Sequence, residues 1–393
     1  MTEQQKGVIT LIKSALDGKA YPLPDNFSME KAVKEALRHK IIALVYYGAL
    51  NCGVDKQSEP MKKLFPALIA VMNVVERQQH AYDKLCQHLE ENGLDYMPMK
   101  GTIIQAYYPK KEMRSMGDAD ILIRPEQSDK VSAAMLACGY VLDHVTDHHD
   151  SWTSSKLEAE IHRAMLPTYA RVSYSHFEDG WKLAKKADDS CYRYDLSAED
   201  FYLYTFVHMT KHYRMSGVGI KHFVDLWIYK NAEPHMDQTY ICNALEKMGL
   251  LSFYKHVMQT VDAWFGDGEA TDQVKYITEV VFNSGEYGLT STREATEILM
   301  EAQKEGSAAK ARRKRALRVV FPGCAVMKQN YKVLDKAPFL LPVFWVVRWF
   351  RTLFFKRSAI KQNLKTKDGQ RDSQVQARKE ALAFVGLDFE KQE

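Results

Sequence analysis

The sequence predicts an α+β fold, in which a small mixed β-sheet with its own helices is flanked by N- and C-terminal helical regions. Three observations predict this class. Apolar residues recur at three- and four-residue steps before residue 93, short strand-like runs follow, and helical spacing returns after residue 197. We therefore expect four regions, which are 1–93, 94–196, 197–310 and 311–393.

The N-terminal region has the pattern of packed helices. In its second half Leu64, Leu68, Val71 and Val75 follow one another at intervals of three or four residues, so they fall on one helix face. The pattern stops at Gly93, and glycine is common where helices end because it accepts left-handed backbone geometry. We interpret this region as an all-helical support.

The central region alternates strand-like and helix-like runs. One helix is expected to begin at Pro125, which suits a first helical turn, and to end at Gly139. The last run alternates with period two, so its apolar residues share one face of a strand while Glu160 and His162 share the other. The expected strands are 95–99, 115–123, 140–145 and 156–165, and the expected helices are 101–108 and 125–139.

Helical patterns return after residue 197. Ser197 followed by Asp200 fits a helix start of the capping-box type, with Asp where Glu or Gln is usual. Beyond the helices come a basic run at 310–318, an apolar and aromatic segment at 337–357, and a polar tail after residue 361, for which we expect a solvated helix or disorder. The expected helices are 198–213, 219–230, 237–248, 251–264 and 291–305.

The composition is that of a folded protein that can bury a core, since 46% of its 393 residues are hydrophobic and 26% are charged. The net charge of +4 does not by itself indicate nucleic acid. The six cysteines form no C-x-x-C pair, which argues against a zinc cluster or a disulfide framework and favours a reducing compartment. We find neither a signal-peptide pattern nor a spanning apolar run, and we expect a cytoplasmic protein.

Two carboxylates stand at the start of the strand predicted at 115–123. Residues i and i+2 of a strand point to the same side, so we expect Asp118 and Asp120 to project together. Like charges so placed need a compensating cation, and Mg²⁺ suits carboxylate oxygens. Gly117 allows close backbone approach, and Glu160 offers a third carboxylate from another strand. Three such carboxylates can hold metal for phosphoryl or nucleotidyl transfer.

A second motif, Lys100-Gly101-Thr102, lies where a strand is expected to give way to a helix. Backbone N–H groups and the helix dipole favour phosphate at such a junction. A lone D-x-D pair is most often a solvated turn, so the metal-site interpretation depends on this second motif and on the alternating strand that carries Glu160.

The segments 100–102, 114–123 and 160–162 together resemble a family of uncharacterised bacterial nucleotidyltransferases in the DNA polymerase β-like superfamily. That superfamily has a glycine at a helix start, an aspartate pair on a strand and a third acidic residue on a later strand. The resemblance extends to 207–229 and, more loosely, to the 321–351 segment, and members often occur near genes for surface-polysaccharide synthesis.

The resemblance implies a nucleotidyltransferase core at 94–196 that moves a nucleoside monophosphate from a nucleoside triphosphate to an unknown hydroxyl acceptor, with Mg²⁺ as cofactor. The attack falls on the α-phosphorus and pyrophosphate leaves. The implied residues are Asp118, Asp120 and Glu160 for catalysis and metal; Lys100, Gly101, Thr102, Arg114 and Gly117 for the nucleotide; and His162, His208, His212, Lys221 and Asp225 for the pocket.

Two departures from the superfamily pattern affect these assignments. The usual Gly-Ser is Gly101-Thr102 here, a mild change because threonine keeps a hydroxyl group. The stretch from Gly101 to Asp118 is also longer than usual. It leaves Lys110 and Lys111 as further phosphate contacts, although we prefer Lys100 and Arg114, which lie beside the two motifs.

Several alternatives stay open from sequence alone. The runner-up function is a catalytically silent nucleotidyltransferase-fold module that acts through a protein partner. His208 and His212 have zinc-ligand spacing, but Met209 stands where a metalloprotease needs glutamate, so residues lining the domain interface are the simpler interpretation. The basic run 310–318 lacks interleaved aromatics, which gives no clear indication of nucleic acid.

The segment 337–357 fits two environments. Its tryptophans and phenylalanines alternate with Arg348, Arg351, Lys356 and Arg357, a composition suited to peripheral contact with a membrane interface. The same residues suit a helix that packs on the core while its cations reach solvent. We favour core packing and keep membrane contact as the alternative.

Overall fold

The computed structural model describes residues 1–167, 171–286, 288–305, 317, 320–331, 333–355 and 368–387. The chain divides into two compact units, one of residues 1–289 with 383–393 and the other of residues 290–382. Each unit is considered by itself. The four-region division expected from the sequence stays a prediction.

The first unit begins with helices, as the sequence predicts. These are α1 (Glu3–Asp17), α2 (Met29–Arg38), α3 (Ile42–Asn51) and the long α4 (Glu59–Glu91). Thr2 caps α1 through a complete capping box with Gln5. Gly93 has a φ of 66° just after α4, which is the left-handed geometry expected where this helix ends.

A five-stranded mixed sheet follows, in the order β1-β2-β5-β4-β3. The β2 and β5 strands are parallel and the other neighbours are antiparallel. This confirms the predicted α+β class with a mixed sheet. The strands are β1 (Tyr96–Met99), β2 (Ala119–Ile123), β3 (Val141–Val145), β4 (His149–Thr153) and β5 (Glu158–His162).

The sheet differs from the sequence prediction at two places. The β2 strand begins at Ala119, four residues later than expected, so Asp118 precedes the strand. The β4 strand is not predicted at all, because only Trp152 of its five residues is buried and the sequence shows no apolar alternation there. Two very short strands, β6 (Lys185–Lys186) and β7 (Tyr194–Asp195), are also missed.

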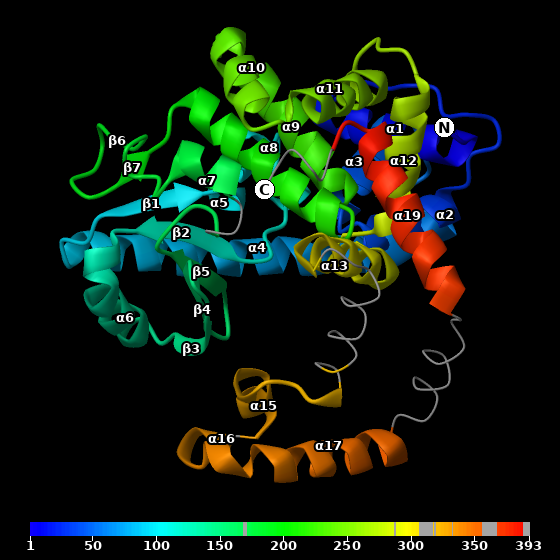
Figure 1. Ribbon diagram of the computed structural model, residues 1–393. Coiled ribbons are helices and arrows are strands. Elements are labelled where there is room, and N and C mark those ends of the chain that lie inside the picture. Colours follow the sequence, from blue (N-terminus) through cyan, green and yellow to red (C-terminus); the bar gives the residue numbers. More distant parts are fainter. Residues whose placement is uncertain are drawn as a thin grey trace. The chain divides into compact units, whose positions relative to one another are not determined.

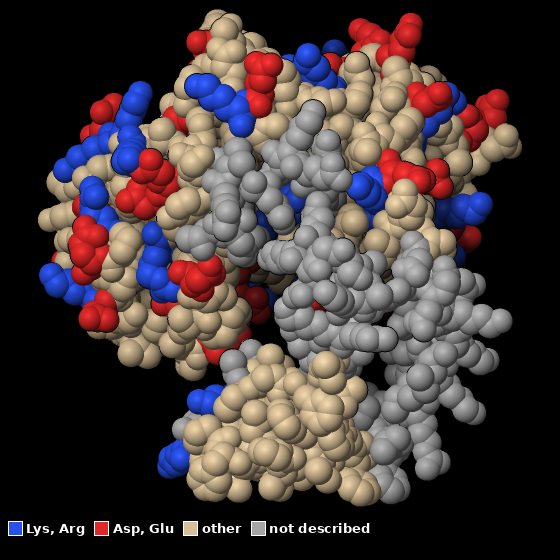
Figure 2. Space-filling model, viewed as in Figure 1, with Lys and Arg blue, Asp and Glu red and all other residues tan. Residues whose placement is uncertain are grey.

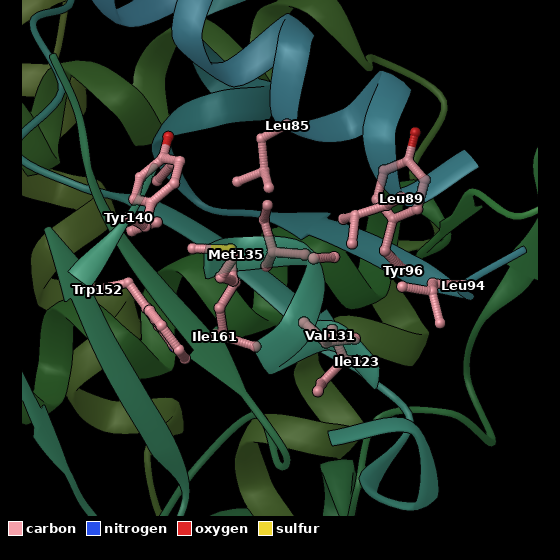
Figure 3. Packing of buried hydrophobic residues seen from close by; sticks show 14 of the residues in the cluster. Leu85, Leu89, Leu94, Tyr96, Ile123, Val131, Met135, Tyr140, Trp152 and Ile161 are labelled. Carbon is pink, nitrogen blue, oxygen red and sulfur yellow. The ribbon is translucent and has the colours of Figure 1, made fainter. Parts of the chain in front are cut away.

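One face of the sheet is covered by helices. Leu85 and Leu89 of α4 and Met135 of α6 (Ser128–Ala137) pack against alternate strand residues such as Ile121 and Ile161 (Figure 3). In Figure 1 the α4 helix runs behind the sheet. Because successive strand residues point to opposite faces, the residues between these apolar ones face away from α4 and α6.

The rest of the first unit is helical. Ser197 caps α8 by accepting a hydrogen bond from the Asp200 N–H, as the sequence predicts. The α12 helix is missing from the sequence prediction although Val274, Ile277 and Val281 have helical spacing and are buried. The helices are α5 (Gly101–Ile104), α7 (Arg171–Phe177), α8 (Ala198–Met215), α9 (Ile220–Ala232), α10 (Gln238–Lys247), α11 (Leu251–Phe265) and α12 (Asp272–Ser284), with 3₁₀ turns η1 (Gln105–Tyr107), η2 (Lys111–Met113) and η3 (Pro125–Gln127).

The second unit is helical where it is described. It holds α13 (Thr290–Glu305), α15 (Cys324–Asn330), α16 (Val333–Lys336), the turn η4 (Pro338–Leu340), α17 (Leu341–Phe355) and most of α19 (Asp368–Phe384). The polar tail therefore contains a helix. The basic run 310–318 lies outside the described residues except for Leu317.

The α17 helix uses part of its surface for packing. The indole N–H groups of Trp345 and Trp349 donate to the carbonyl oxygens of Pro322 and Val320. Among the described residues, no helix has both the length and the apolar character needed to cross a membrane. Large apolar residues of α17 and the preceding turn remain exposed, namely Phe339, Val343, Val346, Val347 and Phe350.

Candidate functional site

The sheet face turned away from α4 and α6 carries a group of polar side chains. In the parallel ladder Asp120 of β2 lies opposite Glu160 of β5, and Leu122 lies opposite His162. Asp120, Glu160 and His162 therefore share this face. Asp120 and Glu160 are directly paired across the two strands, and Glu160 and His162 are two residues apart on β5, so their side chains point to the same side. The predicted strand pattern brings them together as expected.

Asp120 is the centre of the group. Its Oδ1 lies 2.5 Å from the Lys100 Nζ and 2.9 Å from the His162 Nε2. The side chain is 4% exposed. Burial by itself would raise the pKa of Asp120, but the charge of Lys100 and the hydrogen bond from His162 outweigh it and hold the pKa well below its usual range. Asp120 is thus an anion at neutral pH.

Glu160 lies next to Asp120 and contacts the same histidine. Its Oε2 is 3.3 Å from the His162 Nε2. One potential ligand atom each from Asp120, Glu160 and His162 lies within 4.8 Å of the other two. Such spacing lets a single cation reach all three. The donor set, two carboxylates and one imidazole, fits a divalent metal ion.

Asp118 is near the group without belonging to it. It is half-buried in the bend before β2 and lines a cavity of about 290 Å³ together with Glu160. Burial, followed by the charge of Asp120, raises the pKa of Asp118 to about 6. Gly117 is exposed, and a Cβ atom there would meet nothing within 4 Å, so space alone does not demand glycine at this position.

The Lys100-Gly101-Thr102 motif lies at the junction of β1 and α5, as the sequence predicts. Lys100 has a φ of 51°, which is uncommon for a residue with a side chain. This turn directs its ammonium group to Asp120. The Thr102 hydroxyl group donates to the Met99 carbonyl oxygen at 2.7 Å, so this hydrogen bond closes the turn.

Arg114 does not reach the sheet carboxylates in this structure. Its Nε lies 2.8 Å from Oδ1 of Asp225, and its Nη2 lies 3.0 Å from Oδ2. The Tyr108 hydroxyl group donates to the same carboxylate at 2.6 Å. This buried pair ties the loop before β2 to α9. A Cβ atom on Gly101 would lie 3.4 Å from the Arg114 Nη1, so the guanidinium group also supports the Lys100-Gly101-Thr102 turn.

The remaining pocket candidates divide into two sets. Lys221 forms an ion pair with Glu286 at 2.5 Å, and Asp225 forms one with Arg114. Both side chains therefore have partners other than Asp120. His208 and His212 of α8 have their Nε2 atoms 2.9 Å apart. Burial lowers the pKa of His212 to about 4, and burial followed by the charge of Lys100 holds the pKa of His208 well below its usual range. Both rings are neutral at pH 7.

Several residues around this group are not predicted from the sequence. His149 on β4 lies opposite His162, with its Nε2 3.5 Å from Oε1 of Glu160. The charges of Lys100 and Asp120 also act on Tyr204 and Lys211 of α8. The sequence offers one indication of His149, which is the His- and Asp-rich run 143–150. This run points to the site only when the position of β4 is known.

The comparisons with known proteins identify the family. The sequence model of the family described as "Uncharacterised nucleotidyltransferase" matches residues 25–266. The matched segment includes the sheet, the Lys100-Gly101-Thr102 turn and the α8 histidines. The chain belongs to this family, which confirms the predicted nucleotidyltransferase relationship. No curated protein and no solved structure matches the chain.

Proposed function

We propose that this member of the uncharacterised nucleotidyltransferase family is a metal-dependent enzyme that transfers a nucleoside monophosphate from a nucleoside triphosphate to a hydroxyl group. One observation carries the proposal. Asp120, Glu160 and His162 converge on one sheet face beside the Lys100 ammonium group, and the family relationship gives the type of reaction.

Asp120 and Glu160, with His162, are the residues that would hold a divalent cation. Their ligand atoms lie within 4.8 Å of one another. Mg²⁺ is the ion that carboxylates alone would favour. Bound there, a divalent cation supplies charge neutralisation and orientation for a polyphosphate, which are the main catalytic contributions in phosphoryl transfer.

The Lys100-Gly101-Thr102 turn is proposed to hold the triphosphate. Lys100 brings a positive charge to the edge of the carboxylate group, and the absence of a side chain at Gly101 lets a phosphate approach the backbone. The α5 helix has only four residues, so its dipole contributes little and Lys100 supplies the charge. Arg114, held by Asp225, is proposed to position this turn instead of touching phosphate.

The transfer step uses the acceptor hydroxyl oxygen as nucleophile. A bond forms between this oxygen and the α-phosphorus, the bond from the α-phosphorus to the bridging oxygen breaks, and pyrophosphate leaves. The hydroxyl proton passes to a site carboxylate. Asp118 suits this role because it lines the cavity beside Glu160 while standing outside the three-residue ligand group. The nucleotide preference is not encoded by any feature that we identify.

The cavity beside Asp118 and Glu160 is the proposed acceptor site. Ser151 and Thr153 of β4 and His144 of β3 also line it. Hydroxyl and imidazole groups hydrogen-bond well to hydroxyl-rich molecules. A sugar or polysaccharide precursor therefore fits the chemistry of the wall, and we propose a role in surface-polysaccharide metabolism.

Two labelled substrates test this proposal. The protein is incubated with [α-³²P]- or [γ-³²P]-labelled nucleoside triphosphates, divalent metal and a fractionated extract of sugars and polysaccharide precursors. We expect acceptor labelling from the α-phosphate alone, with release of pyrophosphate. The Asp120→Asn variant should lose the labelling, and Asp272→Asn, a change in an exposed residue of α12, should keep it. Acceptor labelling from the γ-phosphate would identify a kinase and contradict the proposal.

A catalytically silent module is the competing function. It would bind a nucleotide or a protein partner without turnover. Nucleotide binding that depends on Asp120, combined with no label transfer to any extract fraction, would favour this module. The convergence of Asp120, Glu160 and His162, with ligand atoms close enough for a single cation, favours an enzyme.

Peripheral membrane contact is proposed for the second unit. Phe339 is 79% exposed and Phe350 is 59% exposed, so core packing leaves much of the apolar surface around α17 uncovered. Figure 2 shows the α15–α17 surface in view as mostly uncharged, with Lys or Arg at one end. Asp335 is the single acidic residue between positions 310 and 357, where Lys and Arg are frequent. Such a surface suits anionic lipid.

Cosedimentation with vesicles tests the membrane contact. We expect the protein to sediment with vesicles that contain phosphatidylserine and to sediment less at high salt. The Phe339→Ser/Phe350→Ser variant should remain in the supernatant. Equal sedimentation of variant and wild type, or none by wild type, would contradict membrane contact while leaving the transferase proposal intact.

A further inference from the structure

An imidazole lies inside the carboxylate group of the sheet. The His162 Nε2 is 2.9 Å from Asp120 Oδ1 and 3.3 Å from Glu160 Oε2. Its side chain is 3% exposed, and its Nδ1 has no hydrogen-bond partner among the residues that the structure describes. The ring is therefore not a solvated surface group, and within the described part of the chain its polar contacts are those of Nε2 with the two carboxylates.

The neighbouring strand supplies a second imidazole. His149 lies opposite His162 in the β4–β5 ladder, their ring centroids are 5.1 Å apart, and the His149 Nε2 is 3.5 Å from Glu160 Oε1. Each carboxylate oxygen of Glu160 thus has a histidine near it. Mg²⁺ takes oxygen ligands and keeps several waters, so a site made for Mg²⁺ alone has no use for nitrogen donors.

We propose that the His162 Nε2 is a metal ligand together with Asp120 and Glu160, and that the protein consequently prefers Mn²⁺ to Mg²⁺. Mn²⁺ accepts carboxylate oxygens as Mg²⁺ does, and it stands with the first-row transition ions, for which imidazole is a good ligand. His149 lies outside this three-residue ligand set. The inference rests on the metal dependence in the proposed function but on no particular nucleotide or acceptor.

Pulsed electron paramagnetic resonance of bound Mn²⁺ tests the ligand directly. Electron spin echo envelope modulation detects a nitrogen nucleus that is bonded to the ion. The full-length protein is prepared with natural histidine and with ¹⁵N-histidine, and one equivalent of Mn²⁺ is added. We expect one imidazole nitrogen coupling, shifted in frequency by the ¹⁵N label. The coupling should persist in His149→Gln, which is the matched control, and disappear in His162→Gln.

Calorimetric titration gives the selectivity. We expect Mn²⁺ to bind wild type more tightly than Mg²⁺, and His162→Gln to weaken Mn²⁺ binding by about tenfold or more with a much smaller effect on Mg²⁺. The double variant Asp120→Asn/Glu160→Gln should bind neither ion at this site.

Three outcomes would overturn the inference: bound Mn²⁺ without nitrogen coupling in wild type, coupling that survives in His162→Gln, or equal affinities for the two ions. The wild-type spectrum does not depend on the folding of any variant. Nucleotide binding measured in parallel separates the two proposals. If nitrogen coupling is absent while metal-dependent nucleotide binding is intact, only the role of His162 as a ligand is rejected. If neither nitrogen coupling nor metal-dependent nucleotide binding is observed, the proposed function is rejected as well.

Discussion

The Lys100 ammonium group and the buried Asp120 carboxylate form an ion pair on the sheet face, with Nζ 2.5 Å from Oδ1. Asp120 is also a member of the proposed metal-ligand group. Lys100 therefore compensates the charge of Asp120 when no metal is bound and competes with a cation for the same oxygen. The pair links the turn proposed for the triphosphate to the site proposed for the metal.

Replacing Lys100 with methionine should separate these two roles. Without the ammonium group Asp120 has less positive charge beside it, so Mn²⁺ should raise the melting temperature more than it does for wild type. Nucleoside triphosphate should stabilise the variant less, because a phosphate contact is gone. Differential scanning fluorimetry measures both. Lys62→Met, a change in an exposed lysine of α4, is the control, and unchanged responses in Lys100→Met would contradict both roles.

Gly101→Ala tests whether the turn needs backbone access. The added Cβ atom would lie 3.4 Å from the Arg114 Nη1, close to ordinary contact, so we expect a stability cost of at most about 1 kcal/mol. If phosphate approaches the backbone there, triphosphate affinity should fall at least tenfold. Titration calorimetry and urea unfolding give the two quantities. Unchanged triphosphate affinity would show that Gly101 is not at the phosphate site.

The Arg114–Asp225 pair should be a stability determinant. Both side chains are below 10% exposed, and the guanidinium group contacts both carboxylate oxygens. Removing one partner leaves the other charge buried, which costs about 3–5 kcal/mol. We expect Arg114→Met and Asp225→Leu each to be strongly destabilising and the double variant to be less destabilised than their sum.

Urea unfolding of the four proteins gives the coupling energy of this pair. The exposed pair Lys230–Asp262, with atoms 3.7 Å apart, is the control, and its coupling should be below about 1 kcal/mol. A coupling energy near zero for Arg114 and Asp225 would mean that the pair does not hold the loop before β2 on α9.

Acidification should destabilise the protein through His212. Burial, and then the charge of Lys211, lower the pKa of His212 to about 4, while an unfolded histidine has a pKa of about 6.5. Between these values the unfolded chain binds the proton first, so stability is present above pH 6.5 and is lost as the pH falls toward 4. From pH 7 to pH 5 the loss attributable to this group is about 2 kcal/mol.

The measurement compares urea unfolding of wild type and His212→Gln at pH 7, 6 and 5, because His208 acts in the same direction and must be subtracted. The variant should lose less stability on acidification than wild type. His235→Gln, a change in an exposed histidine, should match wild type. Parallel pH dependence in wild type and His212→Gln would contradict a neutral, buried His212.

The secondary structure could be predicted from the sequence where the spacing of apolar residues was regular. The α4 helix and the β5 strand follow their apolar repeats closely, as the buried Leu64, Leu68, Ala159 and Ile161 show. The β4 strand could not be predicted, because its pairing with β5 is a tertiary contact. Trp152 is the single buried residue among its five, so the strand shows no alternation of apolar and polar residues.

The candidate site was predicted in outline. Asp120 and Glu160 are paired across β2 and β5, as the strand patterns imply, whereas Asp118 precedes β2 and does not stand beside Asp120 on the strand as predicted. The ion pair between Arg114 and Asp225 could not be predicted, because the two residues are distant in the chain. The sequence around an arginine beside a phosphate motif is the same whether the arginine contacts phosphate or forms an ion pair. His149 was missed because its contact with Glu160 depends on the register of an unpredicted strand.

Nucleoside triphosphate and a divalent cation are proposed to bind together at Asp120 and its neighbours. The most direct test is a thermal-shift titration with each of the four nucleoside triphosphates, with and without Mn²⁺ or Mg²⁺, on wild type and on Asp118→Asn/Asp120→Asn. A ligand that binds only the folded state raises the melting temperature. We predict a metal-dependent shift with at least one nucleotide that disappears in the double variant. A metal-independent shift, the same shift in the variant, or no shift with any nucleotide would contradict the claim.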